Sequence, residues 1–340
     1  MGRTKIRLAE RLAAIALSAA TLLGALPLTA LASPEDSKEL EVAVWSDVHV
    51  LAPELMGDWD SLPENADFQA AVNGDRKMFA ESASILDAAA SQLIADAPDA
   101  LIIPGDLTKD GERASHEYLA ARLNAIKAQL PDLKIYVING NHDVANWTGA
   151  KDYSSGAATA ADTVTPAEFR EIYAGLGYGD SDAVYFEAGD GAGPGSLSYA
   201  ARIAEGFTVI VLDSCKYQIE DTARGMQSDG AITPELMAWA LEQAAEARGR
   251  GDAVIGVEHH NLVPHFDLEP QYFSSYLIDN YAYDSRVLAD GGFGYFLTGH
   301  MHANDIAQVT TRSGNTLYDI ETGSLVTYPS PTRLITFAAG

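Results

Sequence analysis

The sequence predicts an α/β protein built around a buried, largely parallel β-sheet. Five short apolar runs have the length and composition of buried strands, at residues 41–45, 100–104, 135–138, 254–257 and 293–297. The first three are separated by segments with helical apolar spacing, and this alternation is typical of parallel βαβ units. Each run is followed by Asp, His or Asn, and six of the eight histidines stand there. Because the carboxyl ends of parallel strands meet at one edge of a sheet, we expect a functional site at that edge.

The first half of the chain alternates strands and helices. After the first run, residues 51–75 are interrupted by two prolines and a glycine, and we expect them to form a loop near the site. Apolar residues recur at helical spacing over 76–96 and again over 119–130, where Pro131 stops the pattern. Two helices therefore connect the first three predicted strands.

Residues 145–200 differ in composition from the rest of the chain. They are rich in Ala, Ser, Thr, Gly and Asp and lack long apolar runs, so we expect an insertion over the site. Within them, Thr165-Pro166-Ala167-Glu168 is a capping box with proline at the first helical position, which predicts a short helix ending near Tyr173. The glycine-rich run 189–195 lacks the Lys-Ser/Thr of a phosphate-binding loop, and we expect a flexible turn.

The second half resumes the alternation of strands and helices. We expect a strand over 207–212, a helix opened by Thr233-Pro234-Glu235, and two more strands over 253–258 and 293–298. Three last β-like runs lie at 316–321, 325–328 and 334–338.

Residues 1–32 have the features of a signal peptide. Four basic residues precede an uncharged stretch over 12–32. This stretch ends with Ala30-Leu31-Ala32, a cleavage-site pattern. The mature domain would then comprise residues 33–340 and be secreted or displayed on the cell surface. The same stretch is long enough to remain as a single N-terminal anchor, and no later segment is predicted to span a membrane.

The chain is strongly acidic. Its formal net charge is −26, and residues 1–32 hold four basic and one acidic side chain, so their removal would give −29. Such a field repels polyanions and disfavours long DNA or RNA as a partner, although a local metal site can still attract one phosphate. Cys215 is the only cysteine, which excludes an intrachain disulfide and favours a small core residue.

Five motifs at the predicted strand ends carry the candidate ligands. They are Asp47-x-His49, Gly105-Asp106, Gly140-Asn141-His142-Asp143, His259-His260 and Gly299-His300-Met301-His302. Carboxylate, amide and imidazole donors without thiolate suit divalent ions such as Mn, Fe or Zn. In this order the motifs resemble those of the calcineurin-like metallophosphoesterase family, over about residues 40–305.

The resemblance implies a fold and a metal centre. The fold is a four-layer sandwich in which two mixed β-sheets pack face to face, are flanked by helices, and carry the site at the carboxyl ends of the strands. Carried over residue by residue, the resemblance places two divalent ions on seven residues. One ion would be held by Asp47, His49, Asp106 and His302, and the other by Asp106, Asn141, His259 and His300, with Asp106 as the bridge. Hydroxide bound between the ions would attack the phosphoester.

Two assignments stay open between neighbouring residues. His142 follows Asn141 directly, so it can face the scissile ester and protonate the leaving oxygen or bind the phosphoryl group. A carboxylate should orient its ring, and both Asp143 and Asp110 qualify; Asp143 is kept with His142 as a catalytic candidate. Of the pair after the fourth run, His259 is favoured over His260, because it comes first and matches the family's ligand.

Three functions are compatible with these residues. A secreted phosphodiesterase or phosphomonoesterase acting on small extracellular phosphoesters accounts for all seven predicted ligands, for His142 and for the signal peptide. A nuclease would use the same centre but should present a basic groove, which 18 basic against 47 acidic residues in the mature chain disfavour. A non-catalytic, metal-binding secreted protein should have lost a ligand or His142, and none is lost.

Overall fold

A computed structural model describes residues 38–187 and 193–339 of the chain. The predicted signal peptide and most of the glycine-rich run 189–195 lie outside the described residues. Within the described ranges, every helix is too short or too polar to cross a bilayer.

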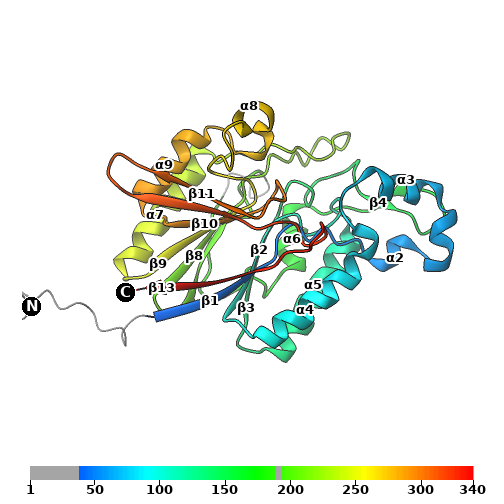
Figure 1. The fold of residues 1–340 in the computed structure, drawn as a ribbon, viewed down its shortest axis with the longest axis horizontal. Helices are drawn as coiled ribbons and strands as arrows, with labels where there is room; N and C mark the ends of the chain where they lie inside the picture. The colour runs from blue at the N-terminus through cyan, green and yellow to red at the C-terminus, as the bar shows by residue number, and fades with distance from the viewer. Residues whose placement is uncertain (1–37, 188–192, 340) are drawn as a thin grey trace, which may run out of the picture. The chain divides into compact units, whose positions relative to one another are not determined.

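The described chain contains two large mixed β-sheets (Figure 1). The smaller has four strands in the order β13-β1-β2-β3, formed by Arg333–Ala339, Lys38–Val44, Ala100–Pro104 and Lys134–Ile138. The larger has seven in the order β11-β12-β10-β9-β8-β7-β6, formed by Asp305–Thr310, Thr316–Glu321, Tyr295–Thr298, Ala253–Glu258, Phe207–Leu212, Tyr199–Ala204 and Val184–Tyr185. A short hairpin joins β4, Lys151–Asp152, to β5, Thr159–Ala160.

Parallel pairing aligns the strands that carry the predicted motifs. Strands β1, β2 and β3 are parallel neighbours in the smaller sheet, and β8, β9 and β10 are parallel neighbours in the larger one. Antiparallel strands complete each sheet, with β13 beside β1 in the smaller and β11 and β7 in the larger. The prediction of two mixed sheets flanked by helices is therefore confirmed.

The two sheets share one buried apolar cluster. Val44 and Ile102 lie in register on β1 and β2 and belong to the same cluster as Val211 and Val257 of the larger sheet. Each such side chain contributes roughly 1.5–3 kcal/mol when it is fully removed from water. Cys215 is also a buried member of this cluster, as predicted.

Helices cover the outer faces of both sheets (Figure 1). Helices α4, Ser82–Asp96, and α5, Arg113–Gln129, pack apolar side chains such as Leu86 and Leu123 against the smaller sheet. Helices α7, Pro234–Gly249, and α9, Tyr281–Gly291, bury a second cluster against the larger sheet. Helix α6, Pro166–Ile172, begins at the predicted capping box, in which Thr165 N donates to Glu168 Oε2 at 2.8 Å.

The prediction of a loop over residues 51–75 is wrong. This segment forms three short helices, namely α2, Pro53–Met56, the 3-10 helix η2, Trp59–Glu64, and α3, Ala66–Gly74. They are too short to show apolar periodicity, yet they bury Leu62 and Phe68 in a separate small cluster. A further 3-10 turn, η3, Phe79–Glu81, precedes α4, so the helix predicted from residue 76 begins later.

The β-like run at 325–328 is also not a strand. It forms turns whose backbone joins distant parts of the chain: Leu325 N donates to Ser46 O at 2.9 Å, and Val326 O accepts from Met78 N at 2.7 Å. Further elements were not predicted from the sequence: the strands β4, β5, β6, β7 and β11, the helices α9 and α8, Glu269–Tyr272, and the turn η4, Ser274–Tyr276. Exposed positions dominate β11, so its composition resembles that of a loop.

Candidate metal centre

The predicted ligands converge because their strands end at the same edge. Residues after β1, β2 and β3 supply Asp47, His49, Asp106 and Asn141, and residues after β9 and β10 supply His259, His300 and His302. Hydrogen bonds join these loops across the two sheets, for example from His300 N to Asp47 Oδ1 at 3.2 Å. All seven residues therefore belong to one site.

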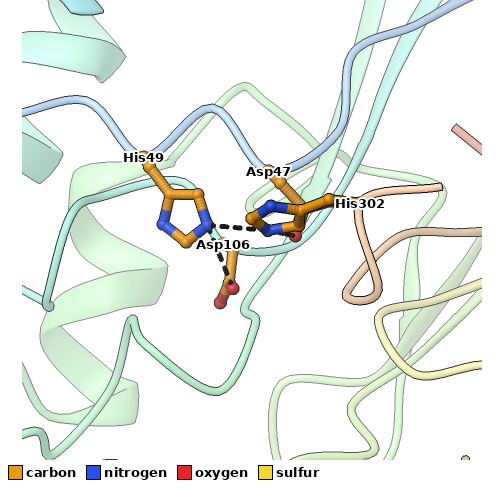
Figure 2. A group of neighbouring side chains, drawn as sticks. All are labelled: Asp47, His49, Asp106 and His302. Carbon is orange, nitrogen blue, oxygen red and sulfur yellow. Dashed lines mark hydrogen bonds and ion pairs between the residues drawn. The ribbon is translucent and has the colours of Figure 1, made fainter. Parts of the chain in front are cut away.

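The first group comprises Asp47, His49, Asp106 and His302 (Figure 2). One potential ligand atom from each lies within 4.8 Å of the others. The Nε2 atoms of His49 and His302 are 3.3 Å apart. His49 Nε2 is 3.4 Å from Asp106 Oδ2, and His302 Nε2 is 3.3 Å from Asp47 Oδ1. Two imidazoles and two carboxylates thus face a common point, which fits a divalent transition-metal ion.

The second group comprises Asp106, His259 and His300, again with ligand atoms within 4.8 Å of one another. Asn141 adjoins it, with Oδ1 2.9 Å from His259 Nε2. Asp106 is therefore common to both groups. His260 points elsewhere, because its Nδ1 lies 2.8 Å from Ser214 Oγ, and the structure places His259 rather than His260 in the group.

Backbone carbonyls orient three of the histidines. Nδ1 of His49 is 3.2 Å from Thr108 O, and Nδ1 of His259 is 2.9 Å from Pro104 O. In His300 the other ring nitrogen, Nε2, lies 2.8 Å from the backbone carbonyl oxygen of Ser228. Since a carbonyl oxygen only accepts, these nitrogens carry the protons, and in the neutral rings the other nitrogen presents a lone pair. Such fixed tautomers are typical of metal-ligating histidines.

The electrostatics suit a cation as well. Burial favours a neutral Asp106, but the His259 and His142 rings outweigh it and hold the pKa of that carboxyl well below its ordinary value. Burial lowers the pKa of the His49 ring well below its usual range, and the positive charge of Lys77 adds to the effect. The Asp106 carboxylate common to both groups is therefore ionised and the His49 ring neutral, the states that metal ligation requires.

Backbone strain is concentrated in the same residues. Asp47, His49, Asp106, His300 and His302 all have positive φ, at 48°, 40°, 48°, 75° and 63°. A non-glycine residue in this region costs roughly 1–3 kcal/mol and persists only where the surrounding structure enforces it. The strain aims these side chains inward directly after each strand, which is a mark of a functional site.

Glycines let the strand-end loops approach each other. A Cβ atom on Gly140 would lie 2.2 Å from Asp106 N, and one on Gly299 would lie 2.1 Å from Ser46 Oγ. Both distances are far inside van der Waals contact, so any side chain would push the loops apart. The glycines in the Gly-Asn-His-Asp and Gly-His-x-His motifs therefore serve close packing of the site.

Asp110, rather than Asp143, contacts His142. His142 Nδ1 lies 2.9 Å from Asp110 Oδ1, while its Nε2 lies 3.9 Å from Asp106 Oδ2. Burial lowers the pKa of His142, but Asp106 and Asp110 together raise it above its ordinary value. The sequence left the orienting carboxylate open between Asp143 and Asp110, and in the structure Asp110 is the one in contact with the ring.

Asp143 instead fastens the loop after β2 to the loop after β3. Its buried carboxylate accepts hydrogen bonds from Gly140 N at 2.7 Å, Leu107 N at 3.0 Å, Thr108 N at 2.9 Å and Thr108 Oγ1 at 2.8 Å. Asp106 directly precedes Leu107 and Thr108, so this network also fixes the residue that the two groups share.

Replacing Asp143 with alanine is expected to destabilise the protein. Three buried backbone N–H groups would lose their acceptor, and each unsatisfied group costs roughly 1–3 kcal/mol, so a loss of at least about 3 kcal/mol is expected. Urea unfolding followed by circular dichroism measures this change. A stability within about 1 kcal/mol of the unmutated protein would contradict the fastening role, because surface substitutions lie in that range.

A cavity of about 250 Å³ opens onto the site. Asp106, Asn141, His142, His300 and His302 line its inner part. Further lining residues come from segments without any motif, among them Arg76, Lys77, Ser228, Ser275 and Tyr276. No sequence pattern marks these five, because their positions depend on how the loops pack over the strand ends.

Comparisons with known proteins agree with this geometry. The model of the family described as calcineurin-like phosphoesterase matches residues 40–304, a range that contains all seven predicted ligands and His142. A search of curated proteins finds no match.

A solved structure shares the fold. A dimetal phosphatase from Danio rerio superposes with a TM-score of 0.53 at 14% sequence identity, over 88% of this chain and 96% of that chain. A phosphopantetheinyl hydrolase from Mycobacterium tuberculosis gives a TM-score of 0.39 at 11% identity, over 86% and 95% of the two chains. At these identities the likeness concerns the architecture alone.

Proposed function

Because the chain belongs to the calcineurin-like phosphoesterase family, and is thus a metal-dependent phosphoester hydrolase, we propose that it hydrolyses small phosphodiesters or phosphomonoesters outside the cell. The observation that carries the proposal is the pair of acid and histidine groups that share Asp106 at the inner end of one cavity, beside His142. Ligand geometry, buried carboxylates and an acid–base histidine are the parts that phosphoester hydrolysis needs.

We assign the seven predicted ligands to two divalent ions of the Mn, Fe or Zn class. Asp47, His49, Asp106 and His302 would hold one, and Asp106, Asn141, His259 and His300 the other. Such ions, when bound, activate water, orient the phosphoryl oxygens and neutralise the charge that develops in the transition state. The protein contributes fixed ligand tautomers and a carboxylate common to both groups.

His142 is placed to serve the leaving group. Its Nδ1 donates to Asp110 at 2.9 Å, so Nε2 is the atom that can give a proton toward the cavity. Asp110 fixes the ring and stabilises its protonated form. A leaving alkoxide oxygen in the cavity would take that proton as its bond to phosphorus breaks.

The cavity and the charge favour small substrates. A volume of about 250 Å³ suits a phosphoryl group with a limited remainder, rather than an extended chain. The formal net charge of −26 opposes the approach of long DNA or RNA, which counts against a nuclease. Residues 1–32, as a signal peptide, would export the protein; cleavage after Ala32 would appear in the N-terminal sequence of the natural protein.

Removal of metal is expected to abolish turnover. After chelation, hydrolysis of p-nitrophenyl phosphate and of bis-p-nitrophenyl phosphate should fall by at least roughly 100-fold, and Mn, Fe or Zn should restore it. The preferred ester identifies the protein as a monoesterase or a diesterase. Failure of every ion to support hydrolysis of either ester would contradict the proposed function.

A further inference from the structure

Two adjacent basic residues line the cavity beside the candidate metal centre. Arg76 and Lys77 come from the turn between α3 and η3, a segment that carries none of the predicted ligands. The whole chain has only 22 basic residues against 48 acidic ones. Two adjacent basic residues at the cavity are therefore unlike the mostly acidic surface charge of the rest of the chain.

The turn that carries them is held in place. Lys77 N donates to Asp75 Oδ1 at 3.0 Å, and Met78 N donates to Val326 O at 2.7 Å. The side chain of Lys77 is only 11% exposed, with Nζ 3.6 Å from Asp75 Oδ2. Arg76 is exposed and, within the described residues, its guanidinium forms no ion pair. Arg76 is thus a cation at the cavity, carried by a backbone that is held in place and available to a ligand.

Charge balance indicates what that ligand carries. Two divalent ions with Asp47 and Asp106 leave roughly two positive charges, which one phosphoryl dianion neutralises. Asp75 also lines the cavity and offsets the charge of Lys77, so the positive charge of Arg76 is the one additional to that sum. A guanidinium binds carboxylate and phosphate oxygens through two parallel hydrogen bonds, so its preferred partner is a second oxyanion.

We propose that Arg76, supported by Lys77, forms a subsite for a second anionic group of the substrate, next to the phosphoryl group that is hydrolysed. This inference rests on the proposed function and narrows its substrate class to phosphoesters that carry a further phosphoryl or carboxylate group. Substrates with a neutral remainder bind without using this subsite.

Calorimetric titration of the metal-loaded protein tests the subsite without any turnover. Three ligands share a phosphonate on a chain of three carbons: propylphosphonate, 4-phosphonobutyrate and propane-1,3-bisphosphonate. The two ligands with a second anion should bind roughly tenfold more tightly than propylphosphonate, as expected for a charge-assisted hydrogen bond. If only the bisphosphonate binds more tightly, the subsite selects a phosphoryl group. If both two-anion ligands bind more tightly, the subsite accepts any oxyanion.

Variants of Arg76 give the decisive comparison. Arg76→Gln should reduce the affinity ratio between two-anion and one-anion ligands to below about twofold, whereas Arg76→Lys should keep part of it. Arg312→Gln is the matched control, because Arg312 is an exposed arginine in the turn between β11 and β12, outside the cavity. It should keep the full ratio.

Two outcomes would overturn the subsite: equal affinity for all three ligands in the unmutated protein, or an unchanged ratio in Arg76→Gln. A different result would overturn the proposed function. If the ratio behaves as expected but no ester is hydrolysed, the subsite stands and the hydrolase proposal falls. If p-nitrophenyl esters are hydrolysed but the ratio is absent, the hydrolase proposal stands and the subsite falls.

Discussion

Replacement of Asp106 with asparagine should lower kcat by at least about 1000-fold, which corresponds to roughly 4 kcal/mol of lost transition-state stabilisation. Asp106 is the one carboxylate common to both ligand groups, and it is 2% exposed. Asparagine keeps the size of the side chain but removes its negative charge from the position that the two ligand groups share. The remaining ligands would then hold the ions less tightly and less close together.

The measurement pairs steady-state hydrolysis of a p-nitrophenyl ester with metal content by mass spectrometry. Metal bound per chain should fall together with kcat in Asp106→Asn. Asp96→Asn serves as the control, because Asp96 is an exposed carboxylate at the end of α4, away from both groups. Full activity and full metal content in Asp106→Asn would show that the Asp106 carboxylate is not a metal ligand.

Replacement of His142 with alanine should produce the second-largest loss, roughly 10²- to 10⁴-fold in kcat on an alkyl phosphoester. An alkoxide leaves with difficulty unless it is protonated, and we assign this protonation to Nε2 of His142, the ring nitrogen that does not contact Asp110. p-Nitrophenolate is a stable anion that leaves without a proton. The loss on a p-nitrophenyl ester should therefore be much smaller.

The dependence on the leaving group separates two roles for His142. Asp110→Asn should show the same preference with a smaller loss, because the ring would keep its place but lose the carboxylate that stabilises its protonated form. An equal loss of activity on alkyl and p-nitrophenyl esters would instead assign His142 to binding the phosphoryl group. Metal content should be unchanged in His142→Ala, since the ring belongs to neither ligand group.

The strands and long helices were predictable because their signals are local. The apolar runs that became β2, β8 and β9 are buried along their whole length, so composition alone marked them. The capping box before α6 was equally clear, since four consecutive residues contain it. Segments 51–75 and 325–328 were assigned wrongly, because burial by distant residues, and not local periodicity, decides their conformation.

The sequence by itself determined the seven predicted ligands and their convergence. Parallel strands carry whatever follows them to one edge of their sheet, so Asp47 and Asp106 had to meet once β1 and β2 paired. His300 follows a strand of the larger sheet and reaches them because the two sheets pack together. The order of the motifs along the chain added the likeness to a family, which the family model supports over residues 40–304.

Only the tertiary structure decided between neighbours in the sequence. His259 and His260 follow the same strand, and Asp143 is closer to His142 in the chain than Asp110 is, yet Asp110 makes the contact. Arg76 and Lys77 reach the cavity from a segment without any motif. Which side chain meets the site is a matter of loop packing and of side-chain direction over a few ångströms. These are set by contacts between residues far apart in the chain, which no local pattern encodes.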